Sequence, residues 1–187
     1  GLVTTNNQEI ADQISLLRAH GITKNSALMS KEVEGDWYYE QIDLGYNYRM
    51  TELQAALGIS QMKRLDEFVT KRHILFKRYN SLLHKSLNKP FQLPESYSSL
   101  HLYPIQVAEK ARKKIFNELR NSGIGVQVHY IPIHTQPFYK KLGFMEEDFP
   151  NSVNYYKRAI SLPLYAGLDF KLQDEVINVV NKILDKI

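Results

Sequence analysis

Hydrophobic positions recur at helical spacing in three long stretches of this chain. In the first, leucine and aromatic residues follow Thr51 at steps of three, four, seven or eight, which predicts a helix reaching about Lys85. The second stretch runs from Glu109 to Ser122 and ends at Gly123, a typical helix stop. The third follows Asp169, a residue type that caps helices. Its predicted buried face consists of Leu172, Val176, Val179, Val180 and Ile183.

The start of the first long helix carries a recognisable capping signal. Thr51 and Gln54 have the spacing of a capping box, in which each side chain satisfies a backbone N–H that the helix start leaves unpaired. The helix is therefore predicted to begin at about Glu52. Asn47, Tyr48 and Arg49 precede it on a loop at the positive end of the helix dipole.

Shorter patterns indicate strands and a further helix. The β-branched run Gly1–Thr5 reads as a strand, and Asn6 with Glu9 then predicts a capped helix that stops at Gly21. Two more strands are predicted at 100–107 and 126–130. Pro104 limits the first to a sheet edge or itself to one end of the strand.

Between these elements, 22–45 is a long polar loop that becomes aromatic at Trp37–Tyr39. Such a loop inside a compact protein is functional or mobile. Its three rings are predicted either to form an interface or to cap the edge of a core.

Composition narrows the class of protein. The chain has 187 residues, 43% of them hydrophobic, no cysteine and a formal net charge of +4. Thiolate metal sites and disulfides are thereby excluded, and no apolar run approaches the length of a membrane span. The basic residues occur as scattered pairs among 20 acidic ones, so we predict no nucleic-acid partner. All of this is compatible with a cytoplasmic protein.

Candidate chemistry concentrates in two places. Asn47 and Arg49 lie before a helix start, where an anion such as a phosphate would be stabilised, although such a run is also ordinary loop chemistry. His129 and Tyr130 end a predicted strand, where they would point to opposite faces, and such a pair is more often structural than functional. His129 and His134 have neither the spacing nor the acidic partner of a metal pair, so no metal site is predicted.

The stretch GYNYRMTELQAALG at 45–58 closely resembles a signature of the DegT/DnrJ/EryC1/StrS family of pyridoxal-phosphate (PLP) sugar aminotransferases. The resemblance covers nearly the whole chain in the family's order, and its wording is most similar to members of the pseudaminic acid pathway. Further matching segments are GLVTTN at 1–6, LRAHG at 17–21, HLYPI at 101–105, VHYIP at 128–132 and SLPL at 161–164.

The resemblance implies an α/β fold: the C-terminal part of a PLP-dependent transferase of fold type I (aspartate aminotransferase-like), ending in a small α+β domain. Residues 1–50 would end the large PLP-binding domain, 51–87 would form a long linking helix region, and 88–187 would form the small C-terminal domain. The Schiff-base lysine would lie upstream of Gly1, because Lys24 does not occupy the matching position. The chain alone would then lack the catalytic lysine and need the missing N-terminal half.

For the parent protein, the resemblance implies transfer of an amino group from glutamate to C4 of a UDP-4-keto-6-deoxy-N-acetylhexosamine. It also implies a homodimer with a shared active site, with Asn47 reaching the neighbour's cofactor or substrate and Arg49 bracing the loop. The segment Gln127, Val128, His129 and Tyr130 would hold the nucleotide sugar. Three alternatives remain: a non-catalytic lobe used for binding or dimerisation, a member acting on a GDP- or TDP-sugar, and, if histidine replaced the upstream lysine, a related dehydratase.

Overall fold

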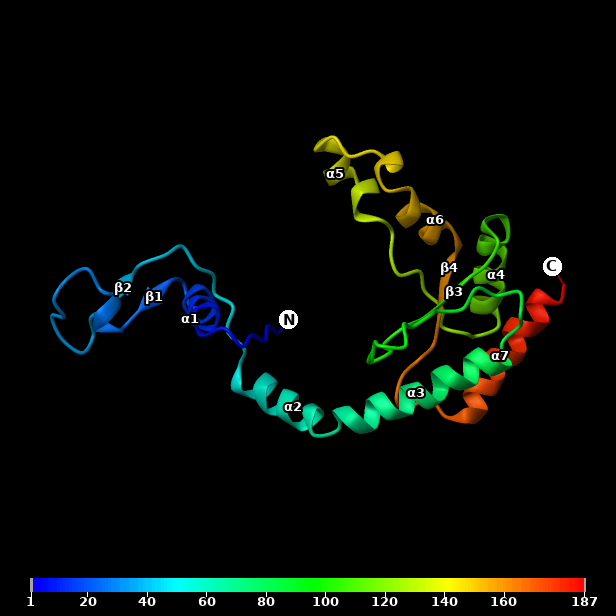
Figure 1. The fold of residues 1–187 in the computed structure, drawn as a ribbon, viewed down its shortest axis with the longest axis horizontal. Helices are drawn as coiled ribbons and strands as arrows, with labels where there is room; N and C mark the ends of the chain where they lie inside the picture. Colours follow the sequence, from blue (N-terminus) through cyan, green and yellow to red (C-terminus); the bar gives the residue numbers. More distant parts are fainter. Residues whose placement is uncertain (1, 187) are drawn as a thin grey trace. The chain divides into compact units, whose positions relative to one another are not determined.

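The computed structural model describes residues 2–186, which divide into two compact units at the boundary between Met62 and Lys63. Figure 1 gives the order of the elements in both units. The first unit contains α1 (Gln8–Leu17), β1 (Ile22–Thr23), a 3-10 turn (Ser26–Leu28), β2 (Glu40–Gln41) and α2 (Glu52–Met62). The predicted domain limits at 50 and 87 differ from this boundary, and the roles given to those ranges stay predictions.

The first unit is held together mainly by hydrogen bonds. β1 and β2 pair antiparallel, with Ile22 opposite Gln41, inside the stretch predicted to be an irregular loop. Among its described residues only Gly21 and Thr23 are buried. The aromatic cluster is not buried within the chain either, since Trp37 is 72% and Tyr39 is 55% exposed. The rings therefore do not cap a core edge in this chain.

The second unit has a hydrophobic core. Its elements are α3 (Leu65–Leu82), β3 (Tyr103–Gln106), α4 (Glu109–Asn121), α5 (Pro137–Lys141), α6 (Pro150–Arg158), β4 (Ala159–Leu162) and α7 (Phe170–Leu184), with short 3-10 turns at Ile133–Thr135 and Glu146–Asp148. β3 and β4 pair antiparallel, and all four residues of β4 are buried. Within this unit, α3 lies beside α7 (Figure 1).

The final helix follows its sequence signals closely. Asp169 caps it, because its carboxylate accepts the N–H of Leu172 at 2.8 Å. The predicted buried face is correct except at Leu172, which is 44% exposed. The next residue, Gln173, is fully buried instead and donates from Nε2 to the carbonyl of Leu75 in α3 at 2.8 Å.

The prediction of one helix from Thr51 to Lys85 is wrong: α2 ends at Met62 and α3 begins at Leu65. Asp66 and Glu67 lie in the first turn of α3, where negative charge stabilises a new helix start. The guanidinium of Arg64 also lies 4.6 Å from the centre of the Phe68 ring. These contacts stabilise an interruption that contains neither glycine nor proline.

Two predicted strands are also wrong. Residues 2–5 are not in a strand, because nothing in the described chain pairs with them, and Gly1 lies outside the described residues. The helix after them is capped by Asn7, whose side chain accepts the N–H of Ile10, and not by Asn6. At 126–130 only Gln127 pairs, with Ser161. Its side-chain oxygen accepts the N–H of Val128 at 3.3 Å, which diverts that group from the ladder.

Candidate functional site

The loop that carries Asn47 is fastened to the end of α1. Asn47 forms an antiparallel bridge with Ala19, just after the helix. Three backbone hydrogen bonds hold the loop here: Tyr46 N to Leu17 O at 2.7 Å, His20 N to Tyr46 O at 2.9 Å, and Tyr48 N to Arg18 O at 2.9 Å. The rings of Tyr46 and Tyr48 stack 4.9 Å apart on either side of Asn47 in the sequence. The backbone at Asn47 is therefore fixed.

This attachment requires glycine at two positions. Gly21 has a φ of +71°, and a Cβ there would lie 1.9 Å from the carbonyl oxygen of Asp43. A Cβ on Gly45 would lie 2.3 Å from the backbone nitrogen of Gly21 and 2.6 Å from the carbonyl oxygen of Leu17. Because both contacts are with backbone atoms, any side chain would push the loop off α1.

The side chain of Asn47 is exposed and oriented. Arg49 donates from Nε to its Oδ1 at 2.8 Å, as expected of a residue that braces the loop. The amide oxygen is thus occupied, and the NH₂ group of Asn47 has no hydrogen-bond partner among residues 2–186. An amide donor beside a guanidinium suits an anionic or oxygen-rich ligand.

The predicted capping box follows directly and is confirmed. Thr51 N donates to Gln54 Oε1 at 3.0 Å, and Gln54 N donates to Thr51 Oγ1 at 3.3 Å. The helix begins at Glu52, as predicted. This reciprocal pair fixes the start of α2 immediately after the Asn47 loop.

The segment Gln127–Tyr130 lies in the second unit, against β4. Gln127 exchanges two backbone hydrogen bonds with Ser161, at 3.3 and 2.7 Å, so its backbone is not available to a ligand. His129 Nδ1 lies 2.9 Å from Ser161 Oγ, which fixes the imidazole ring. Tyr130 is 71% exposed. The groups left for a ligand are the Gln127 amide NH₂, the second ring nitrogen of His129, and the ring and hydroxyl of Tyr130.

Sequence reasoning missed Ser161 as the partner of His129. The only signal was its place in the segment SLPL at 161–164, which was interpreted as an extended helix stop. Because β4 brings Ser161 opposite Gln127, the contact depends on strand pairing across more than thirty positions and has no local signature.

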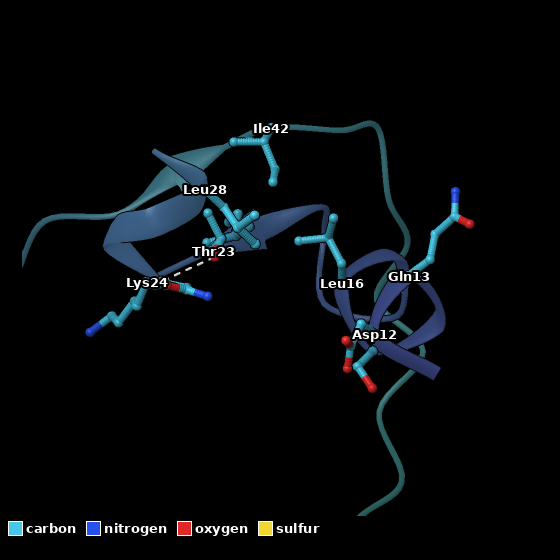
Figure 2. A pocket seen from close by; sticks show the side chains of 10 residues that line it. Asp12, Gln13, Leu16, Thr23, Lys24, Leu28 and Ile42 are labelled. Carbon is cyan, nitrogen blue, oxygen red and sulfur yellow. Dashed lines mark hydrogen bonds between the residues drawn. The ribbon is translucent and has the colours of Figure 1, made fainter. Parts of the chain in front are cut away.

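A cavity of about 670 Å³ lies in the first unit, between α1 and the β1–β2 hairpin. Figure 2 shows the apolar side chains of Leu16, Leu28 and Ile42 near Thr23, whereas Lys24 extends away from them. Asn47 does not line this cavity. Because its lining carries no buried polar group without a hydrogen-bond partner, it indicates no specific ligand.

A second cavity of about 560 Å³ lies in the second unit, and we call it the aromatic cavity. Tyr155 lines this cavity, and its burial raises the pKa of its hydroxyl. One of its lining residues is Tyr130, the last residue of the segment 127–130 that is predicted to bind the substrate, which we call the substrate segment. The residues lining it are Tyr130, Ile131, Pro132, Ile133, His134, Tyr139, Phe144, Phe149, Ser152 and Tyr155.

The described part of the chain shows neither a metal-binding cluster nor a membrane-spanning helix. Residues 2–186 contain no cluster of three or more His, Cys, Asp or Glu side chains able to hold a metal ion. Over the same residues, no helix has both the length and the apolar character needed to cross a bilayer.

Residues 1–181 match the model of the DegT/DnrJ/EryC1/StrS aminotransferase family, and the chain belongs to this family. It is 40% identical over 192 residues to the spore coat polysaccharide biosynthesis protein SpsC of Bacillus subtilis, covering 98% of this chain and 49% of that protein. It is 35% identical to the UDP-4-amino-4,6-dideoxy-N-acetyl-beta-L-altrosamine transaminase of Campylobacter jejuni, covering 100% of this chain and 48% of the relative.

A solved structure supports the same assignment. Helicobacter pylori PseC, an aminotransferase involved in the biosynthesis of pseudoaminic acid, superposes with a TM-score of 0.83 at 29% identity, over 98% of this chain and 48% of its own. The predicted fold class and family are therefore confirmed. The chain spans about half the length of the curated relatives it matches.

Proposed function

We propose that the protein containing this chain is a PLP-dependent aminotransferase acting on a nucleotide sugar. The reaction would move an amino group from glutamate to C4 of a UDP-4-keto-6-deoxy-N-acetylhexosamine, in a pathway of the pseudaminic acid type. The observation that carries the proposal is the family match over residues 1–181, which includes every residue assigned to the site.

The residues present fit the cofactor that the family implies. PLP carries a phosphate and a hydroxyl oxygen on its pyridine ring. The NH₂ group of Asn47 can donate to such an oxygen, because it has no hydrogen-bond partner among residues 2–186 and Arg49 holds the other side of the amide. When bound, PLP supplies an electron sink for carbanionic charge, chemistry that protein side chains cannot provide. In this chain the group that would contact the cofactor is Asn47.

Asn47 would act as an orienting donor. Because Arg49 donates to its amide oxygen, the orientation of the amide is set and its NH₂ group can donate to an oxygen of the cofactor or substrate. We propose that it does so across a homodimer, in the neighbouring subunit's site. Arg49 then keeps the amide from rotating and does not itself contact the ligand.

Gln127, Val128, His129 and Tyr130 would hold the sugar nucleotide. Since Ser161 occupies Nδ1 of His129, the other ring nitrogen faces the ligand with a fixed direction. The exposed Tyr130 ring and the Gln127 NH₂ group would supply one apolar and one donating contact. Val128 would contribute packing.

The test uses the protein encoded by the whole reading frame that contains this chain. Purified protein with PLP, glutamate and the UDP-4-keto sugar is expected to yield the 4-amino sugar, detected by mass spectrometry. Absence of that product, with the keto sugar recovered unchanged, would contradict the proposal. Repeating the assay with GDP- and TDP-linked keto sugars identifies the nucleotide.

Asn47→Ala should lower kcat/KM by about 10- to 100-fold, because a hydrogen bond to a charged group contributes roughly 1.5–3 kcal/mol. Asn6→Ala is the matched control, since Asn6 is exposed and its side chain makes no hydrogen bond among residues 2–186. Its kcat/KM should equal that of the unmodified protein. If both variants have the same kcat/KM, Asn47 does not contribute to the site.

A further inference from the structure

The aromatic cavity, defined above, is lined by rings that are not packed into a closed core. Phe144 is 40% exposed, Phe149 is 48% exposed and Tyr139 is 36% exposed. The ring centroids of Phe144 and Phe149 are 6.4 Å apart, as are those of Tyr139 and Phe144. These faces are available to a flat apolar group, which would gain stacking contacts with them.

One residue of the lining has a polar atom without a partner. His134 is only 9% exposed, and its ring lies 4.8 Å from that of Phe149. Its Nε2 is buried and has no hydrogen-bond partner among the described residues. A buried ring nitrogen is normally paired, so this atom indicates a partner that the chain does not supply.

The charge of the lining restricts what that partner can be. The ten residues lining the cavity include no carboxylate, ammonium or guanidinium group. A phosphate or a carboxylated ligand would be left without a counter-charge here, whereas a neutral planar ring with polar edges fits both the aromatic faces and His134. A volume of about 560 Å³ lies within the usual range of ligand sites.

The position of the cavity connects it with the substrate segment, because Tyr130 belongs to both. We propose that the aromatic cavity receives the nucleobase of the sugar nucleotide. The base would stack on Phe144 and its neighbours, and its polar edge would hydrogen-bond to His134. This inference rests on the proposed function and adds where the base binds.

The test measures binding of UDP and of inorganic pyrophosphate to the protein of the whole reading frame by isothermal titration calorimetry. Phe144→Ala should weaken UDP binding by about tenfold, in line with the loss of one base–aromatic stack. Pyrophosphate binding should not change, because it has no base. Phe91→Ala is the matched control, since Phe91 is 81% exposed and lies outside the cavity.

A second variant protects the test from misfolding. If Phe144→Ala lacks the circular dichroism spectrum of the unmodified protein, Phe149→Ala replaces it, because Phe149 lines the same cavity, is 48% exposed and lies outside the segment 127–130. Equal UDP affinity in the cavity variant and Phe91→Ala overturns the inference. So does an equal loss of pyrophosphate binding.

The two proposals fail separately. Formation of the 4-amino sugar together with UDP binding that is insensitive to the cavity variants overturns only the base site. UDP binding that depends on the cavity, without any amino-sugar product, supports the base site as a nucleoside pocket and overturns only the aminotransferase reaction.

Discussion

At the scale of single residues, Glu40 organises the loop of the first unit. Its carboxylate accepts the N–H of Ser30 at 2.7 Å and of Lys31 at 3.0 Å, and the hydroxyl of Tyr38 at 3.0 Å. The bond from Ser30 is the main reason that the pKa of Glu40 lies below its ordinary value. A carboxylate with a lowered folded pKa stabilises this loop above the unfolded pKa, and the effect is lost as pH falls through the folded value.

Hydrogen exchange checks this. The amides of Ser30 and Lys31 should be protected at neutral pH and lose protection, relative to intrinsic rates, as the solution is acidified below the ordinary glutamate pKa of about 4.3. In Glu40→Gln their protection should be weaker and independent of pH. Glu34→Gln is the control, because Glu34 is exposed and makes no side-chain hydrogen bond within the described residues. Protection that persists through acidification would count against the role of Glu40.

At the scale of elements, α7 completes the end of α3. Asn181 accepts the N–H of His84 at 2.8 Å and donates to the carbonyl of Leu82 at 3.0 Å. The last carbonyls of a helix have no partner within it, so one side chain from another helix here satisfies two backbone groups. The two helices are thereby joined by hydrogen bonds as well as by the core.

Asn181→Ala should lower the free energy of unfolding by about 1–3 kcal/mol, because two hydrogen bonds are lost and the partly buried N–H of His84 is left unpaired. Asn178→Ala is the matched control: it lies on the same helix, is exposed, and has no side-chain hydrogen bond among residues 2–186. Urea denaturation measures both. A difference below about 0.5 kcal/mol between them would mean that water replaces Asn181 without cost.

How far the elements follow from the sequence depends on how local their causes are. The capping box at Thr51 and the cap at Asp169 involve neighbouring residues, so sequence spacing was sufficient. Strand pairing depends instead on distant segments. Neither the pairing of β1 with β2 nor the single pair between Gln127 and Ser161 has a local signal in the sequence. The site divides in the same way: the Asn47–Arg49 contact is local, whereas Ser161 and the aromatic cavity arise from tertiary packing.

At the scale of the whole chain, hydrophobic burial is uneven. Every buried hydrophobic side chain among residues 2–186 lies in the second unit, from Val69 onward. The first unit instead exposes apolar side chains on several faces of α2. These are Leu53 at 85%, Leu57 at 63%, Ile59 at 62% and Met62 at 62% exposure. A helix that is apolar on several faces is normally buried, so α2 indicates a surface that another polypeptide covers.

The 187-residue chain, expressed by itself, should therefore self-associate, since covering apolar surface gains about 25 cal/mol per Å². Sedimentation velocity at micromolar concentrations should show dimers or larger species. The double variant Leu53→Glu, Leu57→Glu should shift the distribution towards monomer, because it places two charges one turn apart on the exposed apolar helix. The double variant Leu93→Glu, Leu142→Glu changes two other exposed leucines and should leave it unchanged. A monomer at every concentration, or an equal response to both double variants, would mean that α2 does not drive association.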